Sequence, residues 1–133
     1  MSGADEPIGR TRWAVAGGHV PVDSTGPEPE MVSHDALSVL NAGDEMADVE
    51  VTLEYARELE AMDGATAGPY RSTVAPRRVE HFRVNDLIDP FAPPLGEDYG
   101  VVVESDVPIV VQFVRQDTRQ AEDAMLSTTA YSE

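Results

Sequence analysis

The strongest structural signal in this sequence is the strict alternation of apolar and polar residues from Asp48 to Tyr55. Val, Val, Leu and Tyr occupy every second position, and Asp, Glu or Thr occupies each position between them. A repeat of two residues is the spacing of one face of a β-strand. The segment is therefore predicted to be a half-exposed strand of an antiparallel sheet, with one face on a core and one in solvent.

A second strand is predicted at Ile109–Val114, an apolar run rich in β-branched residues and too short to cross a bilayer. It is expected to be a buried central strand, reached from the preceding strand through a tight connection at residues 106–108. Further strands are predicted at Thr11–Ala16, which Gly17 and Gly18 end, and at Val32–Leu40, Tyr99–Glu104 and Leu126–Tyr131. The segment Gly68–Pro90 is expected to hold two strands that hinge at Ala75–Pro76 and close with an Asn85–Asp86 turn.

Few segments favour helix. Residues 41–44 (Asn-Ala-Gly-Asp) predict a turn, and Arg57–Gly68 predicts an acidic connection with one helical turn around Glu58–Met62. Asp117 is a possible cap of a short helix. About eight or nine short strands spaced roughly ten residues apart, with little helix, predict an all-β antiparallel β-sandwich or jelly-roll-like barrel.

The length of 133 residues suits one domain with one core. We expect a disordered tail at residues 1–7 and a single β-sandwich domain at residues 8–133. Cysteine is absent, which excludes disulfides and thiol chemistry within this sequence. The first ten residues contain no apolar stretch, so neither a signal peptide nor a membrane anchor is expected there, and a cytoplasmic location is predicted.

The charge is unusual, because 25 acidic residues face nine basic ones and give a net charge of −16. All nine basic residues are arginine. Like charges at this density repel and destabilise a compact chain unless salt screens them, and molar salt shortens the Debye length to roughly 3 Å. The composition therefore indicates a halophilic protein whose carboxylates form a solvated coat. An acidic protein of ordinary salinity is the alternative.

Six of the nine arginines lie in the second half of the chain, and guanidinium groups suit the recognition of anions. One hypothesis is that they line a ligand pocket or a subunit interface, and the other is that they pair with carboxylates of the same fold. Trp13 and Tyr99 are aromatic residues of the core or of a pocket. The candidate ligand or interface residues are Arg71, Arg78, Asn85, Asp86, Arg115, Asp117, Arg119, Gln120 and Tyr70.

Other chemistry has little support. His19, His34 and His81 are not spaced as metal ligands, and structural hydrogen bonding is the expected role for each. No nucleophile–base pattern or phosphate-binding loop is present in the sequence, so no enzymatic activity, metal or cofactor is predicted. The basic run Arg77–Arg83 resembles a nucleic-acid contact, but a net charge of −16 opposes binding to DNA.

Several segments resemble the sensory rhodopsin transducer family: IGRTRWAVA from Ile8, SHDALSVLNAGDE from Ser33, GPYRSTVAPRRVEHFRVNDLIDP from Gly68 and VPIVVQFVRQDTRQAEDAMLSTTAY from Val107. The resemblance implies a β-sandwich that forms a homotetramer and docks on the cytoplasmic side of a membrane-embedded sensory rhodopsin. Stronger acidity, the lack of lysine and a longer connection at Arg57–Gly68 set this chain apart as a haloarchaeal-type member.

The resemblance makes a non-enzymatic cytoplasmic transducer the first functional hypothesis, in which the protein relays the light-dependent state of the receptor. Cytoplasmic loops of membrane proteins carry excess Lys and Arg, which an acidic partner complements. The second hypothesis is a small-molecule binding module for a sugar or an anion, and the third is a DNA-binding regulator.

Overall fold

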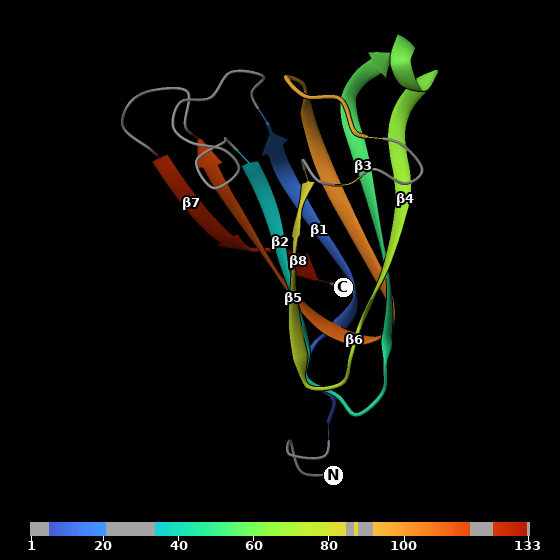
Figure 1. Ribbon diagram of the computed structural model, residues 1–133, viewed down its shortest axis with the longest axis vertical. Helices are drawn as coiled ribbons and strands as arrows, with labels where there is room; N and C mark the ends of the chain where they lie inside the picture. Colours follow the sequence, from blue (N-terminus) through green and yellow to red (C-terminus); the bar gives the residue numbers. More distant parts are fainter. Residues whose placement is uncertain (1–5, 21–33, 85–86, 88–91, 118–123, 133) are drawn as a thin grey trace.

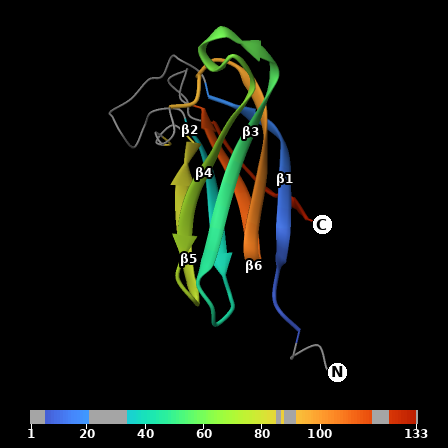
Figure 2. The same cartoon turned by 90° about the vertical axis from the view of Figure 1, so that its right-hand side faces the viewer.

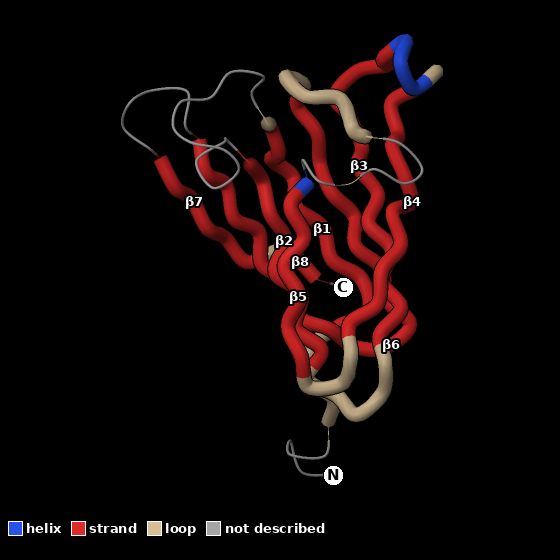
Figure 3. Tube along the Cα trace, in the orientation of Figure 1, coloured by secondary structure: helices blue, strands red, loops and turns tan. Residues whose placement is uncertain are grey.

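The computed structural model describes residues 6–20, 34–84, 87, 92–117 and 124–132, and the side chains of these residues except at positions 34, 61, 115–117 and 124–129. Strand covers nearly the whole described trace (Figure 3). The elements are β1 (Arg10–His19), β2 (His34–Asn41), β3 (Ala47–Leu59), the 3-10 turn η2 (Glu60–Met62), β4 (Gly64–Val74), β5 (Arg78–Arg83), β6 (Asp98–Asp117), β7 (Ala124–Thr129) and β8 (Tyr131–Ser132). Over these residues, no helix is long and apolar enough to cross a membrane.

The strands form two antiparallel layers that share β6. Sheet A has the order β4-β3-β6-β1-β8, and sheet B has the order β5-β2-β6-β7. Figure 1 shows β2, β5 and β7 on one side of the molecule and β3 and β4 on the other, and Figure 2 gives the view at right angles. The predicted all-β antiparallel sandwich is confirmed.

The strand shared by the two sheets corrects one prediction. Tyr99–Glu104 and Ile109–Val114 are not separate strands, because β6 runs unbroken through residues 106–108. Its first part pairs with β1 and β3, and its second part pairs with β2 and β7. At the crossing, the Ser105 hydroxyl donates to the Val107 carbonyl at 2.7 Å and accepts from the Val107 amide at 3.3 Å. This local bonding occupies polar groups of the backbone while the strand passes from one sheet to the other.

The first strand does not end at Gly17–Gly18 as predicted, because β1 continues to His19. The pairing of β1 with β6 shifts register between Val15 and Gly18. A Cβ at Gly18 would overlap the ring of Tyr99. The glycines therefore mark an irregularity in the ladder and a close approach of an aromatic ring, which are common reasons for glycine inside a strand.

The connection predicted at Arg57–Gly68 is also shorter than expected, since β3 extends to Leu59 and β4 begins at Gly64. The helical turn is reduced to η2. The chain turns between β4 and β5 after Val74, as predicted, and Arg77 adopts a positive φ of 56° there. The last predicted strand is two strands, β7 and β8. Asp117 ends β6, and both the helix expected after it and the Asn85–Asp86 turn lie outside the described residues.

The inner faces of both sheets build one core. The alternating segment places Val49, Val51, Leu53 and Tyr55 at 7% exposure or less, which confirms the first prediction. Trp13 is also buried, and its indole nitrogen donates to the carbonyls of Arg10 and Ile109 at 3.0 Å each.

Among the described residues, Asp35 and Asn41 are buried polar side chains, and each has hydrogen-bond partners. The amide nitrogen of Asn41 donates to the carbonyls of Glu45 (2.7 Å) and Val74 (3.0 Å), and its oxygen accepts from the Gly43 amide. Asn41 thereby holds the predicted turn after β2 against the end of β4. The carboxylate of Asp35 accepts from the backbone amide of His19 (2.9 Å) and the hydroxyl of Tyr99 (2.5 Å). Asp35 therefore links β2 of sheet B to β1 and β6.

Candidate functional site

The outer face of sheet A carries a transverse row of four charged residues, which we call the charge row. Strand register places Arg71 of β4 opposite Glu50 of β3, Glu50 opposite Glu104 of β6, and Glu104 opposite Arg12 of β1. Arg71 Nε lies 3.0 Å from Glu50 Oε1, and Arg12 Nε lies 3.8 Å from Glu104 Oε2. Like charges directly opposite each other destabilise a sheet, so the flanking guanidinium groups offset the contact between the two glutamates.

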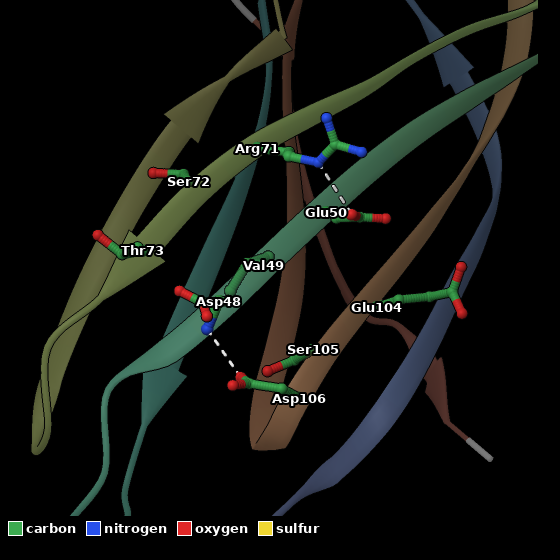
Figure 4. A pocket seen from close by; sticks show the side chains of 9 residues that line it. All are labelled: Asp48, Val49, Glu50, Arg71, Ser72, Thr73, Glu104, Ser105 and Asp106. Carbon is green, nitrogen blue, oxygen red and sulfur yellow. Dashed lines mark hydrogen bonds and ion pairs between the residues drawn. The ribbon is translucent and has the colours of Figure 1, made fainter.

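The charge row borders a groove of about 710 Å³ at the lower part of this face. Its charged lining comprises four carboxylates, Asp48, Glu50, Glu104 and Asp106, and one guanidinium, Arg71. Figure 4 shows Arg71 reaching across to Glu50, and the carboxylate of Asp106 next to the backbone of Asp48. Asp106 Oδ1 accepts from the Asp48 amide at 2.8 Å, which fixes the rim of the groove where β6 starts to cross between sheets.

This lining suits binding of a cationic group. Ser72, Thr73 and Ser105 add hydroxyl groups to the lining. Carboxylates accept hydrogen bonds from guanidinium or ammonium groups, and such charge-assisted bonds are stronger than neutral ones. The groove has the chemistry of a docking surface for basic side chains.

Of the predicted site residues, Arg71 lies in this groove. Its neighbour Tyr70 points into the core, is 4% exposed and has a pKa raised by burial. Arg78 begins β5, is exposed, and donates to the carbonyl of Arg77 at 3.0 Å. The structure therefore does not bring Tyr70 or Arg78 to the groove.

The remaining predicted residues are not placed. Asn85, Asp86, Arg119 and Gln120 lie outside the described residues, and only the backbones of Arg115 and Asp117 are described. Their proposed role at an interface stays a prediction.

Several arginines pair with carboxylates of the same fold. Beside the charge row, Arg57 Nε lies 2.9 Å from Glu97 Oε1, and Arg77 Nη2 lies 2.7 Å from Asp44 Oδ1. These pairs are exposed, and each contributes about 0 to 1 kcal/mol to stability.

Two of the three histidines form structural hydrogen bonds, as predicted. His19 Nδ1 lies 2.8 Å from Asp98 Oδ1, and His81 Nδ1 lies 2.8 Å from Ser38 Oγ.

The acidic groove itself was not predicted. The alternation at residues 48–55 indicated that Glu50 faces solvent, and Glu104 ended a predicted strand. No sequence signal showed that β3 and β6 are neighbours in register, which is what puts the two glutamates side by side.

Comparison with known proteins identifies the family. The sequence model described as ASRT, Anabaena sensory rhodopsin transducer, matches residues 8–132. The chain belongs to this family. Among solved structures, the Anabaena sensory rhodopsin transducer is 48% identical with a TM-score of 0.69, and the match covers 82% of this chain and 99% of that one.

A second solved structure has a fold similar to that of this chain. The crystal structure of Thermotoga maritima 1070 is 26% identical with a TM-score of 0.77, and the match covers 95% of this chain and 97% of that one. No curated protein sequence gives a significant match. Membership of the transducer family supports a transducer role for the chain.

Proposed function

We propose that this protein is a non-enzymatic cytoplasmic transducer that docks on a sensory rhodopsin and relays its light-dependent state. The observation that carries the proposal is the family match over residues 8–132, joined by 48% identity to the Anabaena sensory rhodopsin transducer. For light to be relayed, the protein must bind the dark and illuminated receptor with different affinities. A coupling free energy of about 1–3 kcal/mol, or roughly 5- to 150-fold in affinity, is typical of such systems.

The acidic groove of sheet A is the surface we assign to the receptor. Cytoplasmic loops of membrane proteins carry an excess of Lys and Arg. The carboxylates of Glu50, Glu104 and Asp106 offer acceptors for those cations on one rigid sheet face. Electrostatic complementarity of this kind governs the encounter rate and register more than the final affinity.

We further propose that the protein acts as a homotetramer in a saline cytoplasm. The net charge of −16 and the absence of lysine support the halophilic assignment, because salt screens the mutual repulsion of the carboxylates.

Binding of a sugar or an anion is a weaker candidate. Arg71 is engaged with Glu50, Tyr70 is buried, and four carboxylates line the groove, so the described surface favours a cation over an anion.

The test is co-sedimentation of the purified protein with membranes that carry the rhodopsin encoded by the same organism. The measurement is made in molar potassium chloride, in darkness and under illumination, with membranes lacking the rhodopsin as the control. A bound fraction that differs between dark and light supports the proposal. A protein that stays in the supernatant in both states contradicts it.

A further inference from the structure

A small apolar hollow lies on the outer face of sheet A, beside the acidic groove. Ala14 of β1, Val102 of β6 and Tyr131 of β8 line this hollow of about 120 Å³, and Arg12 and the buried Trp13 complete its lining. Strand register sets Ala14 opposite both Val102 and Tyr131, so these three side chains form one transverse row. We call these three residues the apolar row.

Tyr131 is the exposed member of the apolar row. Its side chain is 70% exposed, the highest value among the exposed large apolar side chains of the described residues. Its backbone is held in β8 by pairing with Ala14, so the ring is presented from a strand. Tyrosine offers a large contact area at a low cost in conformational entropy and is enriched among residues that carry binding energy.

The apolar row and the charge row are neighbours on this face. Val102 lies two positions before Glu104 in β6, and Ala14 lies two positions after Arg12 in β1. Side chains two residues apart on a strand point to the same face about 7 Å from each other. Arg12 borders both rows, because it lines the hollow and its Nε lies 3.8 Å from Glu104 Oε2. A ligand that reaches Glu104 therefore has an apolar contact one side chain away.

We propose that the apolar row receives a large apolar side chain of the same receptor segment whose Lys or Arg enters the acidic groove. The inference rests on the proposed function and names the chemistry of the segment: one basic and one large apolar side chain, about 7 Å apart on one side, as at positions i and i+2 of an extended chain. An apolar cavity of roughly 150 Å³ holds benzene. The hollow of about 120 Å³ therefore has the scale of one such side chain.

Salt is the reason for an apolar contact beside the carboxylates. In the saline cytoplasm proposed above, a Debye length of roughly 3 Å screens most of the attraction between exposed charges. Burial of apolar surface is not screened and contributes about 25 cal/mol per Å². The carboxylates then select a basic segment and set its register, while Tyr131 and Val102 supply the part of the affinity that resists salt.

The carboxylates of the neighbouring row disfavour other occupants. Glu50 and Glu104 repel the phosphates of nucleic acids and of anionic lipids. A second copy of this chain brings a further net charge of −16 toward them. A basic segment with an apolar side chain beside the cation is the occupant that suits both rows.

The first test measures rhodopsin binding by titrated co-sedimentation at two potassium chloride concentrations, both of which keep the protein folded by circular dichroism. Tyr131→Ala should weaken binding about tenfold at both concentrations, whereas the loss in Glu104→Gln shrinks as salt rises. Tyr131→Phe keeps the ring and should restore most of the lost affinity. Leu95→Ala is the matched control, because it removes a side chain that is 42% exposed in the connection before β6.

The second test uses the purified protein without membranes. Two synthetic peptides of equal charge are compared, one repeating Arg-Ser-Leu-Ser and one repeating Arg-Ser-Ser-Ser. Alternate residues of an extended peptide lie on one side, so the first peptide presents arginine and leucine at the spacing of the two rows. We expect calorimetry in molar potassium chloride to show tighter binding of the leucine peptide, and Tyr131→Ala to abolish the difference.

The outcomes separate this inference from the function. The inference is wrong if Tyr131→Ala binds the rhodopsin as the wild type does, if Leu95→Ala causes an equal loss, or if the loss in Tyr131→Ala shrinks with salt as it does in Glu104→Gln. Equal binding of the two peptides also overturns it. A wild-type protein that distinguishes the peptides but does not bind rhodopsin membranes contradicts the transducer proposal and leaves the apolar row as a docking site for a basic and apolar segment.

Discussion

The outer faces of the two sheets differ in charge although they share one strand. Sheet A presents Asp48, Glu50 and Glu104 around a groove, whereas the described outward-facing side chains that β2, β5 and β6 contribute to sheet B include no carboxylate. β6 contributes to both, with Glu104 on sheet A and Val110, Gln112 and Val114 on sheet B. Folding therefore gathers carboxylates of a strongly acidic chain on one outer face and leaves the described side chains of the other without them.

Removing a core residue of the shared strand is expected to have the largest effect. Phe113 is 1% exposed and lies on the inner face of β6, opposite Leu37 of β2. Phe113→Ala should lower the free energy of unfolding by about 3–5 kcal/mol. Chemical denaturation in molar potassium chloride measures this decrease, and a single transition is expected because both sheets share the core.

The control is Gln112→Ala, at the exposed neighbouring position, which should lower the free energy of unfolding by less than about 1 kcal/mol. Separate transitions for the two sheets would contradict the shared core.

Removing the buried carboxylate of Asp35, which joins the two sheets, should give the next largest decrease in the free energy of unfolding. Asp35 of β2 accepts hydrogen bonds from the His19 amide and the Tyr99 hydroxyl. Hydrogen bonds to charged groups contribute about 1.5–3 kcal/mol, so Asp35→Ala should destabilise the protein by at least that amount. Thermal or chemical unfolding gives the value. Tyr99→Phe removes one partner only and should have a smaller effect; equal stability of Asp35→Ala and wild type would show that the link is dispensable.

Alkaline pH is expected to lower the free energy of unfolding through Tyr55 of β3. Burial, followed by the electrostatic influence of Tyr70 and Glu97, raises the pKa of Tyr55 above its ordinary value of 10.0. The folded state therefore keeps the Tyr55 proton more tightly than the unfolded state does. Its contribution to stability is complete below pH 10.0 and is lost as pH rises above that value.

The slope from one such tyrosine approaches about 1.4 kcal/mol per pH unit. Unfolding measured at successive pH values above 10.0 should show this decline, and Tyr55→Phe should reduce the slope. The hydroxyl of Tyr55 donates to the Pro94 carbonyl at 2.8 Å, so the variant should also be somewhat less stable at neutral pH. An unchanged slope in Tyr55→Phe would assign the alkaline loss to other groups.

Neutralising one carboxylate of the groove should have the smallest effect of the four. Glu104→Gln keeps the shape of the side chain and removes one charge opposite Glu50. We expect rhodopsin binding to weaken about three- to fivefold, or roughly 1 kcal/mol, and the loss to shrink as salt rises. Titrated co-sedimentation measures it. Glu54→Gln, on β3 of the same sheet face but outside the groove, is the matched control. An equal loss in both variants would point to net charge instead of the groove.

Sequence patterns predicted strands better than they predicted their limits. The alternation at residues 48–55 and the apolar run at Ile109–Val114 were found because burial of one or both faces of a strand leaves a local signature. Gly17–Gly18 and the segment at residues 106–108 were misread as breaks. At Gly17–Gly18 the strand continues through a register shift in its pairing with β6, and at residues 106–108 the extended chain continues while the Ser105 hydroxyl bonds the Val107 backbone.

The candidate site was predicted only in part, for a related reason. Arg71 was identified by its residue type and lies in the groove. Glu50 and Glu104 are 54 positions apart in the printed sequence, and they resemble the many other solvated carboxylates until β3 and β6 pair. The side chains predicted around Arg115 to Gln120 lie outside the described part of the structure.

By itself, the sequence determined the strand content, the acidic composition and the resemblance to one family, because these depend on local periodicity, on residue counts and on ordered motifs. Tertiary structure alone decided which strands are neighbours, that β6 serves two sheets, and that carboxylates gather on one outer face and are missing from the described side chains of the other. Pairing between segments far apart in the sequence depends on how they pack into the shared core, and no local sequence pattern encodes it.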